Sequence, residues 1–366
     1  MIWSPASSVI GARVDELDTP SLLLDLGKVE RNLDAMAHLF AASPVRVRPH
    51  AKTHKVTNLA LMQLARGAIG VCCAKLGEAE VMAAGGVSEL LVTTEVVGPA
   101  KIHRLIGIAR QTGVITVVDD ATAAEQISDA ASQAGVRLRC LLDVNVGQNR
   151  TGVEPGEPAL ELARRVARLP GLRLVGLQGY EGHLQHIVDA DERRLANAQA
   201  MGLLSQTAEL LLDRGLPVEV VSTAGTGTGL FAAQWPRVTE IQPGSYVVMD
   251  SDYGRVRGLP FENALTLLAS VVSKRKSDSI VDAGSKSLST DAGPAKPVGL
   301  DATYIPQGDE HGKLTFPSGN PLALGDKVEL IPSHCDTTIN LHDAYYVTRD
   351  RYVVAVWPIA ARGRVQ

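Results

Sequence analysis

The sequence is poor in aromatic residues, carries little excess charge and contains no long hydrophobic run. Phe, Trp and Tyr make up 4% of its 366 residues, and 36 Lys and Arg stand against 40 Asp and Glu, for a net charge of −4. A chain this close to neutral lacks the basic field that binds polyanions, so we expect a small-molecule partner and no nucleic acid. No apolar segment reaches the roughly 18 residues of a spanning helix, so we expect no membrane partner.

Cysteine is also scarce. The four cysteines, Cys72, Cys73, Cys140 and Cys335, show no CxxC spacing, which in a chain of this length favours reduced core residues over disulfides or a zinc site. The first twenty residues contain no cation before Arg13, unlike the basic start of a secretory signal. We therefore expect a cytoplasmic protein.

Apolar residues are abundant, at 45%, and follow a repeating pattern from about residue 20 to 250. Short β-branched segments alternate with segments of helical spacing, as in 28–40, which is typical of βα units and a parallel sheet. The segment 21–26 is an extra strand or a lead-in to the first helix. Eight further candidate strands lie at 45–49, 69–73, 89–93, 114–119, 137–145, 172–180, 218–223 and 239–248.

Eight is the number of strands that closes a parallel barrel. From about residue 260 the helical spacing stops, and strand-like segments separated by Gly, Pro and Asp turns follow at 264–276, 278–284, 313–334 and 344–357. The sequence therefore predicts an α/β protein with a (β/α)8 TIM barrel over residues 20–255. Residues 1–19 and 256–366 are expected to form a mostly antiparallel β domain that packs against the barrel.

Catalytic residues of such barrels lie at the carboxyl ends of the strands. The first barrel strand is followed by RPHAKTHK, in which Lys52 stands among Arg48, His50, His54 and Lys55. A lysine among other cations and partly desolvated has its neutral amine favoured, the condition for Schiff-base chemistry. The alternative from the residues alone is a basic loop that binds a phosphate.

Polar residues follow other strands as well. The seventh barrel strand ends in the Gly- and Thr-rich segment 221–229 and the eighth in QPGSY at 242–246, and barrel enzymes often bind phosphate at these two strands. Neither segment matches a Walker loop or a strict GxGxxG, so a plain glycine turn is the alternative. The remaining candidates after the fifth and sixth strands are Asp143, Asn145, Arg150, Gln178, Tyr180, Glu181, His183 and His186.

In the predicted β domain, His334 and Asp336 are two residues apart. In an extended chain they point to the same side and Cys335 points away. One imidazole and one carboxylate make half of a divalent-metal site, which water or substrate would complete. A surface hydrogen bond between them is the bland alternative.

Taken in order, these motifs resemble a known family. The segments DTPSLLLDL, RPHAKTHK, CCAKLGEAE, TTEVVGPAK, LLDVNVGQNRTGV, QPGSYVVMDSDYG and PSHCDTTINLHD are similar to those of the D-threonine aldolases. These enzymes belong, with the D-serine dehydratases, to the alanine-racemase-like class of pyridoxal-phosphate enzymes. The resemblance runs from about residue 18 to near the C-terminus and implies pyridoxal 5'-phosphate, a D-configured substrate and a homodimer.

The resemblance also implies roles for individual residues. Lys52 looks like the lysine that bonds the cofactor, Arg150 like the arginine near its phenolic oxygen, and His186 like a base for the substrate hydroxyl. Gln178 and Tyr180 would line the pyridine ring, and His334 and Asp336 would bind the metal. Around the phosphate would stand Thr223, Gly225, Thr226, Gly244, Ser245 and Tyr246. One departure is Glu181, which stands where several family members have a histidine.

The activity implied is the retro-aldol cleavage of D-threonine and related D-β-hydroxy-α-amino acids to glycine and an aldehyde. The carboxylate of Asp336 suits Mn²⁺, Mg²⁺ or Ca²⁺ better than Zn²⁺. The nearest alternative is a dehydratase of D-serine or 3-hydroxyaspartate, whose family resembles a His-x-Cys ligand pattern. A racemase would not need the metal pair, and a non-catalytic pyridoxal-phosphate carrier would resemble a lone barrel.

Overall fold

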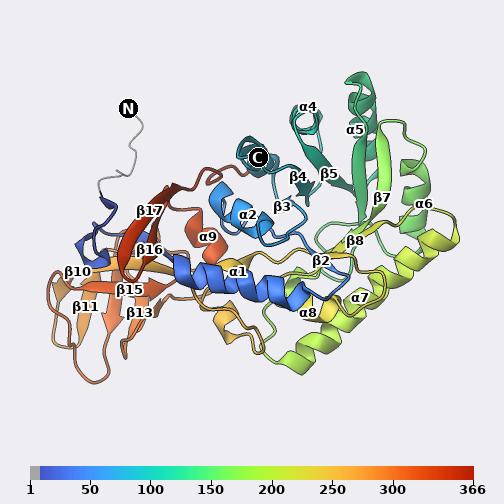
Figure 1. The fold of residues 1–366 in the computed structure, drawn as a ribbon. Coiled ribbons are helices and arrows are strands. Elements are labelled where there is room, and N and C mark those ends of the chain that lie inside the picture. Colours follow the sequence, from blue (N-terminus) through green and yellow to red (C-terminus); the bar gives the residue numbers. More distant parts are fainter. Residues whose placement is uncertain (1–8) are drawn as a thin grey trace.

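The computed structural model describes residues 9–366 and contains two sheets, a parallel one ringed by helices and a mostly antiparallel one beside it (Figure 1). Each strand of the first sheet pairs in parallel with its neighbour. Its order is β2 (Arg46–Val47), β9 (Glu240–Ile241), β8 (Val220–Thr223), β7 (Leu172–Gly179), β6 (Leu138–Asp143), β5 (Gly113–Val118), β4 (Glu89–Val92) and β3 (Val71–Cys73).

The two edges of this sheet meet. The segment that follows β2 bonds to β3, because the amide of Ala51 donates to the carbonyl of Cys72 at 2.8 Å and the amide of Cys72 donates to the carbonyl of Pro49 at 2.8 Å. Eight parallel strands closed in this way form a barrel. The predicted alanine-racemase-like TIM barrel is confirmed.

The last of the predicted barrel strands is much shorter than expected. The segment 239–248 was predicted as one strand, but only Glu240–Ile241 pairs, and Ser245–Val247 is a 3₁₀ helix. Pro243 has no amide hydrogen, so the ladder cannot continue through it. The chain therefore turns across the mouth of the barrel at Gly244.

Helices follow the strands and cover the outside of the barrel (Figure 1). Asp120 and Asp189 cap two of them, each carboxylate accepting two amide hydrogen bonds from the first turn, which explains why helices begin there. In chain order the helices are α1 (Leu26–Phe40), α2 (Thr57–Leu64), α3 (Leu76–Ala84), α4 (Pro99–Ala109), α5 (Ala121–Gln133), α6 (Glu157–Val166), α7 (Ala190–Asp213) and α8 (Gly229–Ala232).

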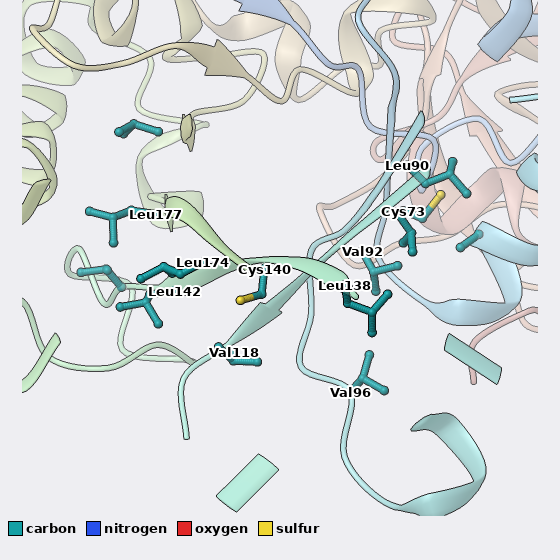
Figure 2. Packing of buried hydrophobic residues seen from close by; sticks show 14 of the residues in the cluster. Cys73, Leu90, Val92, Val96, Val118, Leu138, Cys140, Leu142, Leu174 and Leu177 are labelled. Carbon is teal, nitrogen blue, oxygen red and sulfur yellow. The ribbon is translucent and has the colours of Figure 1, made fainter. Parts of the chain in front are cut away.

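Alternation along each strand divides the barrel core into two layers. Cys72 and Leu91 belong to a small cluster inside the barrel, whereas Cys73, Leu90 and Val92 belong to the large cluster between strands and helices. Figure 2 shows part of this outer cluster. All four cysteines are buried and unpaired, as the sequence predicts.

The second sheet is built mainly from the C-terminal third of the chain. Its strands are β1 (Ser21–Asp25), β10 (Leu265–Lys274), β11 (Asp278–Val281), β12 (Lys296–Pro297), β13 (Thr303–Pro306), β14 (Gly312–Thr315), β15 (Lys327–Ile331), β16 (Ala344–Arg349) and β17 (Tyr352–Pro358), with α9 (Cys335–Ile339) between β15 and β16. Pairing is antiparallel except between β1 and β16.

The pairing of β1 moves one predicted boundary. Residues 20–255 were assigned to the barrel, but Ser21–Asp25 pairs with β10 and β16 of the second sheet. The first crossing into the barrel therefore lies after residue 25, and the exact division into domains stays a prediction. The two parts share a core, in which Val29 and Leu33 of α1 cluster with Leu265 and Leu330. Among residues 9–366, none of the helices has the length and apolarity needed to span a membrane.

Candidate active site

A cavity of about 360 Å³ opens at the carboxyl ends of the barrel strands, next to the start of α9. Eleven of the predicted site residues line it, coming from both the barrel and the β domain. They are Lys52, Arg150, Gln178, Tyr180, His186, Gly225, Thr226, Gly244, Ser245, His334 and Asp336. Residues almost 300 positions apart in the chain therefore meet in one place.

Lys52 stands on the turn after β2 and faces the β domain. Its Nζ lies 3.7 Å from Oδ2 of Asp336 and 5.9 Å from the ring centroid of Tyr180. Burial lowers the pKa of Lys52, but interactions with the phenol of Tyr180 and the carboxylate of Asp336 outweigh burial and leave the pKa above its ordinary value. The expectation that the neutral amine is favoured by neighbouring cations is therefore wrong.

Two of the neighbouring cations, Arg48 and Lys55, do not act on Lys52 because each is paired with its own carboxylate. Arg48 forms a two-pronged pair with Glu240 inside the barrel, with contacts of 3.0 and 2.9 Å. Lys55 lies 2.5 Å from Glu78 and is buried with it. Neither positive charge is free to repel Lys52.

Unlike Arg48 and Lys55, the two histidines of RPHAKTHK are neutral at pH 7 because both are buried. Burial lowers the pKa of His50 well below its ordinary value, with a further contribution from Lys52. Burial lowers the pKa of His54 to about 4. Of the two, His50 lines the cavity, and its Nε2 lies 3.1 Å from Oγ1 of Thr93.

Tyr180 lies close to two cations. The guanidinium carbon of Arg150 is 5.8 Å from the centroid of the Tyr180 ring, and Nζ of Lys52 also approaches this ring. The loop of Arg150 is held by Asp143, whose Oδ2 accepts a hydrogen bond from Thr151 at 2.9 Å. Oδ1 of Asp143 accepts from Nε2 of Gln178 at 2.8 Å. One carboxylate therefore sets the positions of two predicted site residues.

The chain turns at Gly225–Thr226 and Gly244–Ser245 form one wall of the cavity. Side chains longer than glycine do not fit there: a Cβ on Gly244 would lie 2.5 Å from Oγ1 of Thr53, and one on Gly225 would lie 2.6 Å from Oε1 of Gln185. Among residues 9–366, no acceptor takes the backbone N–H groups of Thr226, Gly244 or Ser245. Free amide donors with small side chains fit a phosphate group.

Two residues predicted to surround the phosphate do not line this cavity. The hydroxyl of Thr223 donates to the carbonyl of Gly179 at 2.6 Å. The ring of Tyr246 packs on Phe261, and its hydroxyl accepts a hydrogen bond from Gln63. Only the backbone amide of Tyr246 turns to the predicted phosphate wall, where it donates to Oγ1 of Thr226 at 3.1 Å.

Glu181 lies behind this wall and does not line the cavity. Its Oε1 accepts hydrogen bonds from the hydroxyl of Thr228 at 2.6 Å and from Nδ2 of Asn197 at 3.1 Å. Burial raises the pKa of Glu181. Gln185 joins the network by donating to Thr228 and accepting from the amide of Gly227, so Glu181 supports the glycine-rich loop from below.

His334 and Asp336 meet at the cavity, but not as an extended pair. Asp336 stands in the first turn of α9, and His334 is the residue before that helix. The alternation argument is therefore wrong, although both side chains line the cavity and Cys335 is fully buried. Helical geometry separates Cys335 from its neighbours because successive side chains on a helix point about 100° apart.

The imidazole of His334 is fixed by a carboxylate. Nδ1 of His334 lies 2.6 Å from Oδ2 of Asp291, which makes Nε2 the nitrogen available to a metal. Burial raises the pKa of Asp291, but hydrogen bonds from Ser289 and His334 outweigh burial and leave it lowered. A carboxylate behind a histidine is the usual second-layer partner of a metal-binding imidazole.

His186 has a similar arrangement. Its Nδ1 lies 2.7 Å from Oδ2 of Asp252, and its ring packs on Tyr253 at a centroid distance of 4.4 Å. Burial lowers the pKa of His186 more than Asp250 and Asp336 raise it. A neutral ring at pH 7 suits a proton acceptor.

Comparisons with known proteins identify the family of this chain. Residues 24–252 match the family model of the alanine racemase N-terminal domain, and residues 264–348 match a model described as "Putative serine dehydratase domain". The chain is 41% identical over 365 residues to D-threonine aldolase from Arthrobacter sp., covering 98% of this chain and 96% of that one. It belongs to the D-threonine aldolase family.

Two further relatives support this membership. A 3-hydroxy-D-aspartate aldolase of Paracoccus denitrificans is 38% identical over 97% of this chain and 94% of its own. The crystal structure of D-threonine aldolase from Filomicrobium marinum has a TM-score of 0.95 at 41% identity, with 100% of both chains covered. The D-threonine aldolase family thus accounts for both the barrel and the β domain.

The residues present can supply only part of the coordination sphere of a metal ion. Among residues 9–366, no group of three or more His, Cys, Asp and Glu side chains is arranged to hold an ion. His334 and Asp336 supply one nitrogen and one oxygen, and water or substrate oxygens must supply the rest.

Sequence reasoning missed several residues of this D-threonine aldolase family site. Asp252 and Tyr253 stand in a quoted family segment but received no role, and Asp291 lies 43 positions before the histidine it holds. Thr93, Thr94 and Gln242 also line the cavity. Thr93 is the last residue of a predicted strand, which was the available signal, and Gln242 stands in the quoted segment QPGSY but received no role.

Proposed function

We propose that this chain is a pyridoxal-phosphate- and divalent-metal-dependent lyase that cleaves D-threonine and related D-β-hydroxy-α-amino acids to glycine and an aldehyde. The observation that carries the proposal is the 3.7 Å separation of Lys52 Nζ and Asp336 Oδ2 in one cavity. Two carbons separate the amino nitrogen and the hydroxyl oxygen of such a substrate. A lysine at one end and a metal ligand at the other match that spacing.

Pyridoxal 5'-phosphate would be held by Lys52 and by the wall around Gly225 and Gly244. Tyr180 offers its ring to the cofactor's pyridine, and Arg150, free of any carboxylate among the described residues, offers a cation for its phenolic oxygen. When bound, the cofactor delocalises the electron pair left on Cα as the Cα–Cβ bond breaks.

The metal would be held by Nε2 of His334 and by Asp336. Asp336 keeps its negative charge, because Lys52 outweighs the effect of burial and lowers the pKa of this carboxyl. The carboxylate oxygen of Asp336 suits Mn²⁺, Mg²⁺ or Ca²⁺, whereas an imidazole suits transition metals, and we propose manganese as the effective ion. When bound, the ion polarises the substrate's β-hydroxyl as a Lewis acid.

His186 would accept the proton that the β-hydroxyl loses. With Nδ1 engaged by Asp252, Nε2 is the available acceptor. As the proton moves to Nε2, the hydroxyl oxygen forms a double bond to Cβ, and the Cα–Cβ electron pair remains on Cα. The aldehyde leaves, and Cα takes up one proton, which balances the proton lost by the β-hydroxyl and gives glycine.

The second candidate is a dehydratase, favoured by the match of residues 264–348 to the serine dehydratase model. A dehydratase would convert D-threonine to 2-oxobutyrate and ammonia. Against it stands the ligand pair, because the position two after His334 is Asp336 and not a cysteine. Cys335 cannot substitute: it is fully buried, and burial raises the pKa of its thiol well above the ordinary value.

The oligomeric state and the cellular location are also proposals. We propose a cytoplasmic location and a homodimer, of which the family resemblance supports the homodimer. Light scattering of the purified protein would then give about twice the 38.8 kDa chain mass. A monomer that is fully active would overturn the dimer.

The proposed function is tested by replacing the attachment point of the cofactor. Lys52→Ala should remove the visible absorbance of bound cofactor and stop glycine release from D-threonine. The matched control is Lys75→Ala, since Lys75 is exposed and makes no side-chain contact with the cavity. Full activity of Lys52→Ala would overturn the proposal.

A further inference from the structure

Asp252 lies behind His186 and outside the cavity. Its side chain is 12% exposed and its Oδ2 lies 2.7 Å from Nδ1 of His186, whose ring lines the cavity. Two unprotonated acceptor atoms 2.7 Å apart would repel each other, so this distance favours a proton on Nδ1 of the imidazole. No hydrogen bond joins Nε2 of His186 to another residue in the part of the chain that the structure describes.

The turn that carries Asp252 is bonded to the segment of the predicted metal ligands. The amides of Ser251 and Asp252 donate to the carbonyls of Pro332 and Ser333, at 3.0 and 3.3 Å. Asp250, which is 1% exposed, accepts a hydrogen bond from the amide of Cys335 at 2.8 Å. The amide of Cys335 lies between His334 and Asp336 in the chain.

The same turn also fixes its own shape. The second oxygen of Asp250 accepts from the amide of Tyr253 at 2.8 Å, and the ring of Tyr253 packs on His186. Residues 250–253 therefore contact His186 through a carboxylate and a ring. They contact the ligand segment through two backbone–backbone hydrogen bonds and through the carboxylate of Asp250.

We propose that Asp252 is a positioning residue that holds His186 in the Nδ1–H tautomer, and that residues 250–253 set the place of His186 relative to His334 and Asp336. This inference rests on the proposed function, in which Nε2 accepts the proton of the β-hydroxyl. Asp252 acts through His186, because it does not line the cavity and cannot reach the substrate.

The first experiment compares Asp252→Ala with the matched control Arg255→Ala. Arg255 is the other side chain bonded to Asp252, and it is 65% exposed. Asp252→Ala should lower kcat for D-threonine by about 10- to 100-fold, the usual cost of removing such a partner, with KM and the visible cofactor absorbance unchanged. The kcat of Arg255→Ala should stay within about twofold of that of the parent enzyme. This control separates the contact of Asp252 with His186 from its contact with Arg255.

A double-mutant cycle then tests whether Asp252 acts through His186. In an enzyme that already carries His186→Gln, adding Asp252→Ala should cause no further loss. If the loss of kcat in the double variant equals the product of the two single losses, the proposal is overturned. If Asp252→Ala does not fold, Asp252→Asn has the same shape and should lower kcat by at least about fivefold, because its amide can also donate to Nδ1 and admit the wrong tautomer.

A readout independent of turnover uses the cofactor-free protein. The ¹⁵N spectrum of the nine histidines, with His186 assigned from the His186→Gln spectrum, should report a protonated Nδ1 in the parent. Asp252→Ala should shift that signal toward the other tautomer, and an unchanged signal would overturn the proposal. Because this arm needs no substrate, it distinguishes failure of the inference from failure of the proposed function, which would show as a parent enzyme that releases no glycine.

Discussion

Nζ of Lys52 and Oδ2 of Asp336 lie 3.7 Å apart and join the barrel to the first turn of α9. The pair is an ion pair between the predicted attachment point of the cofactor and a predicted ligand of the metal. Each group has a second partner in the proposed reaction, so loading the enzyme must separate them. Attachment of the cofactor and binding of the metal therefore both depend on how the β domain packs against the barrel.

The first prediction concerns the metal ligands. Asp336→Ala and His334→Ala should each abolish metal-dependent release of glycine, because each removes one of two protein ligands. The visible absorbance of the bound cofactor should remain, since Lys52 is intact. His342→Ala is the matched control, because His342 bonds to the carbonyl of Ser287 and does not line the cavity. Activity that survives both ligand substitutions would refute the metal assignment.

The second prediction concerns the carboxylate behind His334. Asp291→Asn should raise the manganese concentration needed for half-maximal activity by about 10- to 100-fold, because the imidazole loses its fixed orientation and some basicity. Activity at saturating manganese should be close to that of the parent. Titration with the metal after EDTA treatment measures the change, and an unaltered midpoint would count against a role for Asp291.

The third prediction concerns the glycine at the predicted phosphate wall. Gly244→Ala should weaken the binding of pyridoxal phosphate, because the new methyl group would lie 2.5 Å from Oγ1 of Thr53. Gly202→Ala is the control: no atom lies within 4 Å of its Cβ position, and alanine in a helix is favoured by up to about 1 kcal/mol. Cofactor titration followed by absorbance compares the two. Equal affinity in both variants would contradict the account of the wall.

The fourth prediction concerns pH. Burial and the nearby Asp143 raise the pKa of Glu95 to about 7 from an ordinary value of 4.5. Between these values the folded protein binds the proton more tightly than the unfolded chain, so this group makes stability fall as pH rises through that window. Glu95→Gln should reduce this fall in the free energy of unfolding by about 1–2 kcal/mol, after allowance for the partial exposure of Glu95. Urea unfolding of both proteins at pH 5 and pH 8 measures it, and parallel pH profiles would disprove it.

The fifth prediction concerns a buried arginine that holds the loops of the site. Arg193 is 1% exposed and donates to the carbonyls of Ile187, Gly227 and Arg257 at 2.5, 2.8 and 2.6 Å. Arg193→Met should lower the free energy of unfolding by about 2–4 kcal/mol, because several buried acceptors lose their donors. Arg194→Met, on the exposed face of the same helix, should change it by less than about 0.5 kcal/mol. Equal stability of the two variants would be the contrary result.

The barrel was predictable from sequence because its strands are buried on both faces. Short β-branched segments such as 114–119 alternate with helical spacing, and that pattern depends on local burial alone. The assignment of Ser21–Asp25 to the second sheet was not predictable, because its partners β10 and β16 lie far along the chain. The end of β9 was missed for a local reason, the proline at position 243.

The site was predictable as a list of residues and less so as a geometry. Strand ends and the family resemblance identify His186 and His334, but not the carboxylates that contact them. Asp252 and Asp291 act through side-chain contacts with residues distant in sequence. The charge of Lys52 was misjudged for the same reason, because Arg48 and Lys55 are neutralised by Glu240 and Glu78.

The measurement that tests the central claim most directly follows the fate of D-threonine. The purified protein is incubated with pyridoxal phosphate, Mn²⁺ and D-threonine, with and without EDTA, and glycine, acetaldehyde and 2-oxobutyrate are quantified together. The account predicts equal amounts of glycine and acetaldehyde, lost on adding EDTA and restored by excess Mn²⁺. Formation of 2-oxobutyrate, or glycine release that EDTA does not affect, would contradict it.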